Sequence, residues 1–60
     1  MFISRIDLPV YFMQWFPVGK SLKPIWTDPE DMRRYPSPED AAEDMLKLTE
    51  QGYAVVLEDA

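Results

Sequence analysis

The chain has 60 residues, no cysteine, no histidine and a formal net charge of −5 at pH 7. A domain of this size buries only about 60% of the surface that its unfolded chain exposes, which leaves no room for a deep catalytic cleft. The missing residue types exclude disulfides, thiolate metal sites and the commonest general base. We therefore expect a single domain over residues 1–60 that is not an enzyme and has no cofactor or metal.

The charge is distributed unevenly along the chain. Residues 1–27 carry three basic side chains and one acid, a net of +2, whereas residues 28–60 carry ten acids and three basic side chains, a net of −7. This acidity disfavours direct binding to nucleic acid or to an anionic membrane, and favours a protein partner with a basic surface. The sequence shows neither a signal peptide nor about 20 consecutive apolar residues, so we expect a cytoplasmic protein.

Two segments near the amino terminus predict the first strands. Residues 2–7 alternate in polarity with an apolar bias at their start, and Leu8-Pro9 interrupts the pattern. Residues 10–16 are β-branched and aromatic, which favours a second strand with two apolar faces. That strand is predicted to place Val10, Phe12 and Phe16 on one face and Tyr11, Met13 and Trp15 on the other.

The second of these faces has two interpretations. In the first, the strand is central, covered by a helix on one side and partly exposed on the other. In the second, Tyr11, Met13 and Trp15 form an exposed patch for a partner or for a second copy, because contiguous apolar surface on a small protein marks an interface. Trp26 is a further candidate anchor, since aromatic side chains dominate interface hot spots.

Residues 17–24 have proline at both ends and Gly19 inside, which predicts a loop. Gly19-Lys20-Ser21 ends like a phosphate-binding loop, but Gln14 stands where the first glycine of that motif belongs, so we expect no nucleotide site. A short strand is then predicted at residues 25–28 and a single helical turn at residues 29–32.

A helix over residues 38–51 has the clearest signals in the chain. Ser37 can cap its first N–H groups, Pro38 suits the first helical position, and Gly52 can supply the left-handed residue that ends it. Its core stripe is predicted to consist of Ala41, Ala42, Met45, Leu48 and Thr49, with Leu46 on the flank. Its opposite face, either simply solvated or used for binding, carries Glu39, Asp40, Glu43, Asp44, Lys47 and Glu50.

The segment at residues 26–43 reads Trp-Thr-Asp-Pro-Glu-Asp-Met-Arg-Arg-Tyr-Pro-Ser-Pro-Glu-Asp-Ala-Ala-Glu. It resembles a pattern common in small uncharacterised phage and mobile-element proteins. There, a tryptophan strand, an Asp-Pro turn and an Arg-aromatic step lead into a Ser-capped Glu-Ala helix, and a Gly-Tyr step leads into a final strand. The likeness covers residues 25–58. It implies a compact sheet-and-helix domain of phage origin and carries over no catalytic residue.

These features predict an α+β fold, in which one main helix packs on one face of a small antiparallel sheet. The predicted order is β-β-β-α-β, with the last strand at residues 53–58. The helix allows this last strand to pair at an edge of the sheet or beside the first strand.

The functional hypothesis is a small, acidic, non-enzymatic binding protein, encoded by a phage, that inhibits a host protein complex. Such a role includes anti-defence activity, for example anti-CRISPR activity, or host takeover. A narrower form is nucleic-acid mimicry: Glu39, Asp40, Glu43 and Asp44 would be spaced by about 6 Å along a helix, close to the spacing of phosphates along a strand. The alternative is a structural or accessory homodimeric module, or a small virion subunit.

Overall fold

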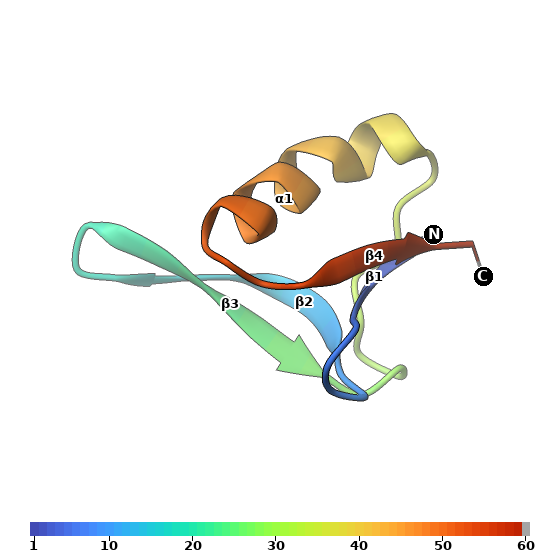
Figure 1. Cartoon of the computed structure of the whole chain (residues 1–60), viewed down its shortest axis with the longest axis horizontal. Helices are drawn as coiled ribbons and strands as arrows, with labels where there is room; N and C mark the ends of the chain where they lie inside the picture. The colour runs from blue at the N-terminus through green and yellow to red at the C-terminus, as the bar shows by residue number, and fades with distance from the viewer. Residues whose placement is uncertain (60) are drawn as a thin grey trace.

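The computed structural model describes residues 1–59, which form a four-stranded antiparallel sheet and one helix (Figure 1). The sheet order is β3-β2-β1-β4, so the last strand of the chain pairs with the first. Helix α1 lies across one face of this sheet, which confirms the predicted α+β fold and its β-β-β-α-β order. The elements are β1 (Phe2–Arg5), β2 (Tyr11–Val18), β3 (Ser21–Thr27), α1 (Pro38–Glu50) and β4 (Val55–Glu58).

The core lies between α1 and the inner face of the sheet. It consists of Ile3, Phe12, Tyr35, Ala41 and Leu48, each at most 6% exposed. The helical stripe that reaches this core is narrower than predicted, because Ala42 and Thr49 are exposed. The physical reason is that α1 packs mainly on β4 and β1, the two shortest strands, which offer little apolar surface.

The β2–β3 hairpin is longer than predicted. Residues 17–24 are not a loop: they continue the two strands, and the chain reverses in a two-residue turn at Gly19-Lys20. Gly19 has φ of 62°, as the first central residue of a type II′ hairpin turn requires. Pro17 and Pro24 are tolerated because, in this part of the hairpin, β2 and β3 pair only with each other and each has one unpaired side. A proline can lie with its nitrogen, which carries no hydrogen, toward that unpaired side without loss of a hydrogen bond.

A β-bulge interrupts β2 between Phe12 and Gln14. The extra residue, Met13, reverses the alternation of side chains, so Phe12 and Trp15 lie on the same face with ring centroids 5.1 Å apart. The predicted faces are therefore wrong beyond the bulge: Trp15 turns toward the helix, and Phe16 turns outward and is 55% exposed.

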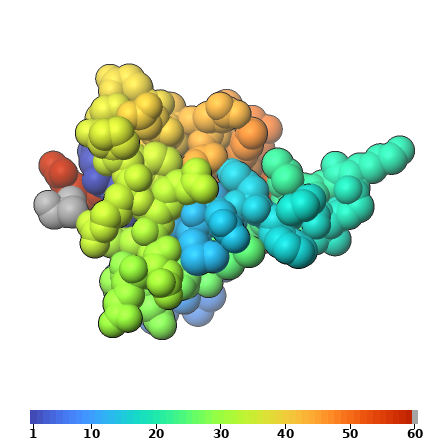
Figure 2. Space-filling view, turned by 180° about the vertical axis from the view of Figure 1, so that it is seen from behind, coloured from blue at the N-terminus to red at the C-terminus, as the bar shows by residue number. Residues whose placement is uncertain are grey.

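The connection from β3 to α1 acts as part of the sheet framework. β1 and β2 pair next to the turn that joins them and diverge beyond it, and residues 33–35 fill the resulting gap. The Tyr35 N–H donates to the Met1 carbonyl (2.7 Å), the Met1 amino group donates to the Tyr35 carbonyl (2.9 Å), and the Arg33 N–H donates to the Phe12 carbonyl (3.0 Å). From behind, residues 28–36 cover one half of the molecule while the hairpin extends from the other (Figure 2).

The predicted ends of the elements shift by a few residues. β1 ends at residue 5 rather than 7, β4 begins at residue 55 rather than 53, and residues 29–31 form a turn closed by the Asp31 N–H and the Asp28 carbonyl (3.1 Å) rather than a helical turn. β3 likewise ends at residue 27 and α1 at residue 50. Such shifts arise because strand ends depend on where a partner strand stops.

The two ends of α1 differ in how well the sequence anticipates them. Gly52 has φ of 93°, and the N–H groups of Gly52 and Tyr53 donate to the carbonyls of Thr49 and Leu48, which closes the helix as predicted. Ser37, however, makes no hydrogen bond to the helix backbone; its hydroxyl donates to Asp40 (2.8 Å) instead.

Candidate functional site

Trp15 and Asp44, two residues expected on the partner-binding surface, meet each other inside the molecule. The Trp15 indole N–H donates to one oxygen of the Asp44 carboxylate at 2.8 Å, and the Tyr35 hydroxyl donates to the other at 2.6 Å. Asp44 is half-buried rather than solvated, and both of its oxygens have a partner. We call Trp15, Tyr35 and Asp44 the carboxylate latch, because it ties β2 and the β3–α1 connection to the helix.

The latch is suited to holding structure and not to moving protons. Burial raises the pKa of the Tyr35 phenol well above its ordinary range, and the hydrogen bond to Asp44 raises it further. The phenol therefore remains a hydrogen-bond donor throughout the physiological pH range. Such charge-assisted hydrogen bonds are stronger than neutral ones, so the carboxylate fixes the position of both aromatic rings.

The other three predicted anchors are also packed within the molecule. Tyr11 contacts Phe2 edge-on at 5.6 Å on the sheet face opposite α1, and the Met13 carbonyl accepts from the Arg33 side chain at 3.0 Å. Trp26 packs against the core from β3. None of Tyr11, Met13, Trp15 and Trp26 is among the large apolar side chains that the described chain exposes most.

Trp26 belongs to a second cluster that the sequence analysis did not find. The Arg5 guanidinium lies 5.0 Å from the Trp26 ring and 5.1 Å from the Tyr53 ring, and it forms an ion pair with Asp7 at 2.8 Å. The hydrogen bond from Arg5 lowers the pKa of the Asp7 carboxyl. This cluster joins β1, β3 and the connection between α1 and β4, and the stacking places Arg5 in a structural role.

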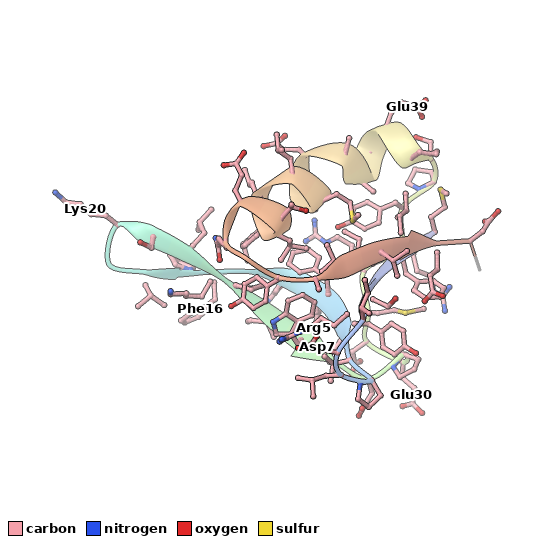
Figure 3. The ribbon with its side chains drawn as sticks, in the orientation of Figure 1. Arg5, Asp7, Phe16, Lys20, Glu30 and Glu39 are labelled. Carbon is pink, nitrogen blue, oxygen red and sulfur yellow. The ribbon has the colours of Figure 1, made fainter. Side chains whose placement is uncertain are left out.

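One group of exposed apolar side chains lies on the outer part of the β2–β3 hairpin. We call residues 16–23 the hairpin arm. It extends past the end of α1, with Lys20 at its tip (Figures 1 and 3). Phe16 is 55% exposed, Val18 51% and Leu22 41%, because neither the helix nor another strand covers this part of the ribbon.

The hairpin arm is also the basic part of the molecule. Residues 8–27 contain no acid, and Lys20 and Lys23 both lie on the arm. Phe16 and Lys23 pair across the two strands, so an apolar ring and a cation share one face. The sequence pattern did not predict this surface, because residues 17–24 were expected to form a loop. Two features of the sequence could have indicated it: the absence of acids from residues 8–27, and the Gly19-Lys20 pair in a segment of apolar residues.

Most of the predicted acidic face of α1 is exposed in the structure, with Asp44 as the exception. Glu39, Asp40, Glu43 and Glu50 are exposed as predicted, although Asp40 accepts from Ser37 and Glu43 pairs with Lys47 at 3.0 Å. Leu46, expected on the flank of the core stripe, points away from the core and is 60% exposed. At 100° per residue the outermost side chains form what we call the α1 stripe: Glu39, Ala42, Glu43, Leu46 and Glu50.

Two shallow hollows lie on the described part of the surface. One, of about 420 Å³, lies at the base of the hairpin arm and is lined by Ser21, Leu22, Lys23, Gln51 and Tyr53. Another, of about 320 Å³, lies beside the β1–β2 turn, where Ile6, Leu8 and Val56 form a second exposed apolar group. Within residues 1–59 no group of His, Cys, Asp or Glu side chains is placed to hold a metal ion.

No helix in the described part of the chain is long and apolar enough to cross a membrane. Comparison of the sequence and the structure with family models, with curated proteins and with solved structures found no match.

Proposed function

We propose that this protein is a non-enzymatic binding protein and that the hairpin arm is its main contact surface. The observation that carries the proposal is the exposure of Phe16, Val18 and Leu22, at 41% to 55%, on a ribbon that α1 leaves uncovered. Phe16 and Val18 share one face of the ribbon, and Leu22 lies on the other. A small protein that exposes large apolar side chains to water gains from covering them with a partner. Central apolar and aromatic anchors of this kind contribute most of the binding energy in interfaces.

The wider role that we propose is inhibition of a host protein complex by a phage-encoded protein in the bacterial cytoplasm. Its support is the resemblance at residues 25–58, together with the small size and the acidic charge. The hairpin arm suits an apolar part of the target, and the α1 stripe suits a basic part. Binding to such a target would block anti-viral defence, as an anti-CRISPR protein does, or redirect a host process, without contacting nucleic acid or membrane directly.

The acidic face supports nucleic-acid mimicry less strongly than the sequence alone suggested. Glu39, Asp40 and Glu43 are exposed, but Asp44 is held in the carboxylate latch and Lys47 neutralises part of the row. The exposed leucine at position 46 has no counterpart in a phosphate backbone. We therefore place the target contact on an apolar surface bordered by charge rather than on a phosphate-like row.

The proposal is tested with two matched variants. Phe16→Ser combined with Leu22→Ser replaces one exposed apolar side chain on each face of the arm without changing charge. Val56→Ser removes a side chain as exposed as Leu22 (both 41%) from the other apolar group, near the β1–β2 turn. Tagged wild type and both variants are expressed in a bacterium with an active anti-viral defence, and two quantities are measured: host proteins retained and phage plating efficiency.

The expected result is that wild type and Val56→Ser retain the same host complex and raise plating efficiency, whereas the arm variant does neither. Circular dichroism and thermal unfolding confirm that the variants are folded. Retention that is equal for the arm variant and wild type would refute the arm as the contact surface, and an absence of specific retention by wild type would refute the binding role.

A further inference from the structure

Two surfaces of this chain are complementary to each other in chemistry. One face of the hairpin arm combines the exposed apolar side chains of Phe16 and Val18 with Lys23, Lys20 lies at the tip, and the arm has no acid. The α1 stripe combines an exposed leucine and an alanine with three glutamates. Each surface therefore offers an apolar centre, bordered in one case by positive charge and in the other by negative charge.

The two surfaces cannot meet within one molecule. The arm extends away from the helix, and Lys20 and Glu39 lie at opposite ends of the structure (Figure 3). The arm is the outer part of a β-ribbon in which β2 pairs with β3 from Tyr11–Thr27 to Val18–Ser21. It therefore does not fold back without breaking the sheet. A contact between arm and stripe must therefore join two copies.

We propose that a second copy of this chain occupies the hairpin arm, with the arm of each copy packed on the α1 stripe of the other. This inference rests on the proposed function in treating the arm as a contact surface: the second copy occupies the arm when no host target covers it. The reciprocal arrangement makes the interface isologous, so the assembly closes as a two-fold dimer and does not grow further. Leu46 is the centre of each contact: it lies between Glu43 and Glu50 on the surface and faces Phe16 of the other arm, on the face that also carries Lys23.

Charge complementarity favours a second copy of the chain as the partner of the arm. Each chain carries a net charge of −5, so two copies repel each other at long range. Salt at physiological concentration limits that repulsion to about 8 Å, whereas arm lysines and stripe glutamates in contact attract each other locally. Two contacts of this modest size correspond to a transient interface with a dissociation constant on the order of 10 µM.

Charge reversal distinguishes this local attraction from the effect of net charge. The arm-reversed chain carries Lys20→Glu and Lys23→Glu, which change its net charge from −5 to −9. The stripe-reversed chain carries Glu39→Lys and Glu50→Lys, and a control carries Glu30→Lys and Asp31→Lys on the turn before α1; both have a net charge of −1. The two substitutions in the stripe are balanced for helix stability, because lysine is unfavourable at the start of a helix and favourable at its end.

The measurement is sedimentation equilibrium from about 1 to about 500 µM protein, concentrations that bracket the expected dissociation constant. We expect the wild type to dimerise and the control to dimerise at least as tightly. The arm-reversed and stripe-reversed chains should each dimerise about tenfold more weakly or worse. An equimolar mixture of the two should recover a dimer, because every arm then meets a stripe of opposite sign. A single chain with all four substitutions should dimerise as well.

A monomeric wild type at the highest concentration would overturn the proposal. So would a stripe-reversed chain that dimerises as well as the control, because net charge alone would then explain the association, or a mixture that fails to recover the dimer. The host-retention assay separates this failure from failure of the proposed function. A monomer whose arm variant loses the host complex refutes the second copy alone, whereas a dimer whose arm variant keeps it refutes the host-binding role of the arm.

Discussion

Asp44 shows how a single residue changes its role between sequence and structure. On a helical wheel it belongs to a row of solvated acids, but in the fold it accepts hydrogen bonds from Trp15 and Tyr35. A half-buried carboxylate with two aromatic donors holds three segments of the chain together. Its removal leaves both donors without a partner at a place where water has limited access.

We expect Asp44→Ala to destabilise the protein by about 2 kcal/mol, since two donors lose a charged acceptor. Urea unfolding followed by tryptophan fluorescence measures the change. Glu43→Ala, on the neighbouring and mostly exposed position, should cost less than about 0.5 kcal/mol. Equal effects of the two substitutions would show that the latch does not stabilise the fold.

The Tyr35 phenol gives the stability a defined dependence on alkaline pH. Its pKa is raised in the folded state by burial and by Asp44. Above the ordinary tyrosine pKa of about 10, the unfolded chain releases this proton while the folded chain keeps it, so the unfolded state binds fewer protons and stability falls as pH rises. Below that pH the contribution is fully present.

The matching experiment compares the wild type with Tyr35→Phe in urea unfolding at several pH values above neutrality. We expect the phenylalanine variant to lose less stability between neutral pH and strongly alkaline pH, because it lacks the phenol whose proton the folded wild type retains. Lysine titration affects both proteins alike and cancels in the comparison. An ultraviolet titration should show a late tyrosine ionisation in the wild type that Tyr35→Phe lacks. Parallel pH profiles would mean that Tyr35 keeps an ordinary pKa.

At the scale of elements, the β2–β3 hairpin depends on one residue in its turn. Gly19 has φ of 62°, and a Cβ at this position would meet no atom within 4 Å. A substitution therefore acts through the backbone alone, since residues with a side chain rarely adopt this conformation.

We expect Gly19→Ala to cost about 1 kcal/mol, because the left-handed conformation is strained for alanine. Lys20→Ala in the same turn should be nearly neutral in thermal unfolding and serves as the control. A substitution at Gly19 without cost would indicate that the turn adopts another conformation in solution. It would then also weaken the case for a rigid arm.

At the scale of the whole molecule, charge is separated in space as well as along the chain. The acid-free segment contains the whole β2–β3 hairpin, whereas the ten acids of residues 28–60 lie on the β3–α1 connection, on α1 and at residues 58–59. Among these ten acids, the described structure pairs only Glu43 with a basic side chain, Lys47, so most of the excess is not offset. Repulsion among the acids therefore opposes folding more than the pairs favour it.

We expect the melting temperature to rise by a few degrees when salt increases from about 10 mM to about 200 mM, because screening relieves repulsion between exposed acids. Differential scanning calorimetry at low protein concentration measures this with little contribution from self-association. A fall in melting temperature would instead mean that attractive pairs outweigh the repulsion.

The sequence predicted only part of the candidate site. The features that depend on nearby residues were predicted, whereas those that depend on residues far apart in the chain were not. The exposure of Glu39 and Glu43 follows from helical periodicity, which is a local property. The inward turn of Trp15 and the exposure of Phe16 follow from one extra residue at the bulge, whose position depends on pairing with β3. No local pattern in residues 10–16 marks that position, so alternation placed these side chains on the wrong faces.

The sequence by itself determined the α+β class, the order of the elements and the close of α1 at Gly52, because apolar periodicity, a proline at the start and a glycine past the end act within a few residues. Only the tertiary structure decided the strand order, the partners of Asp44 and the uncovered arm. These depend on contacts between residues such as Ser4 and Val56 that are far apart in the chain. A short helix can cover only part of a longer hairpin, and that mismatch in length leaves the arm exposed.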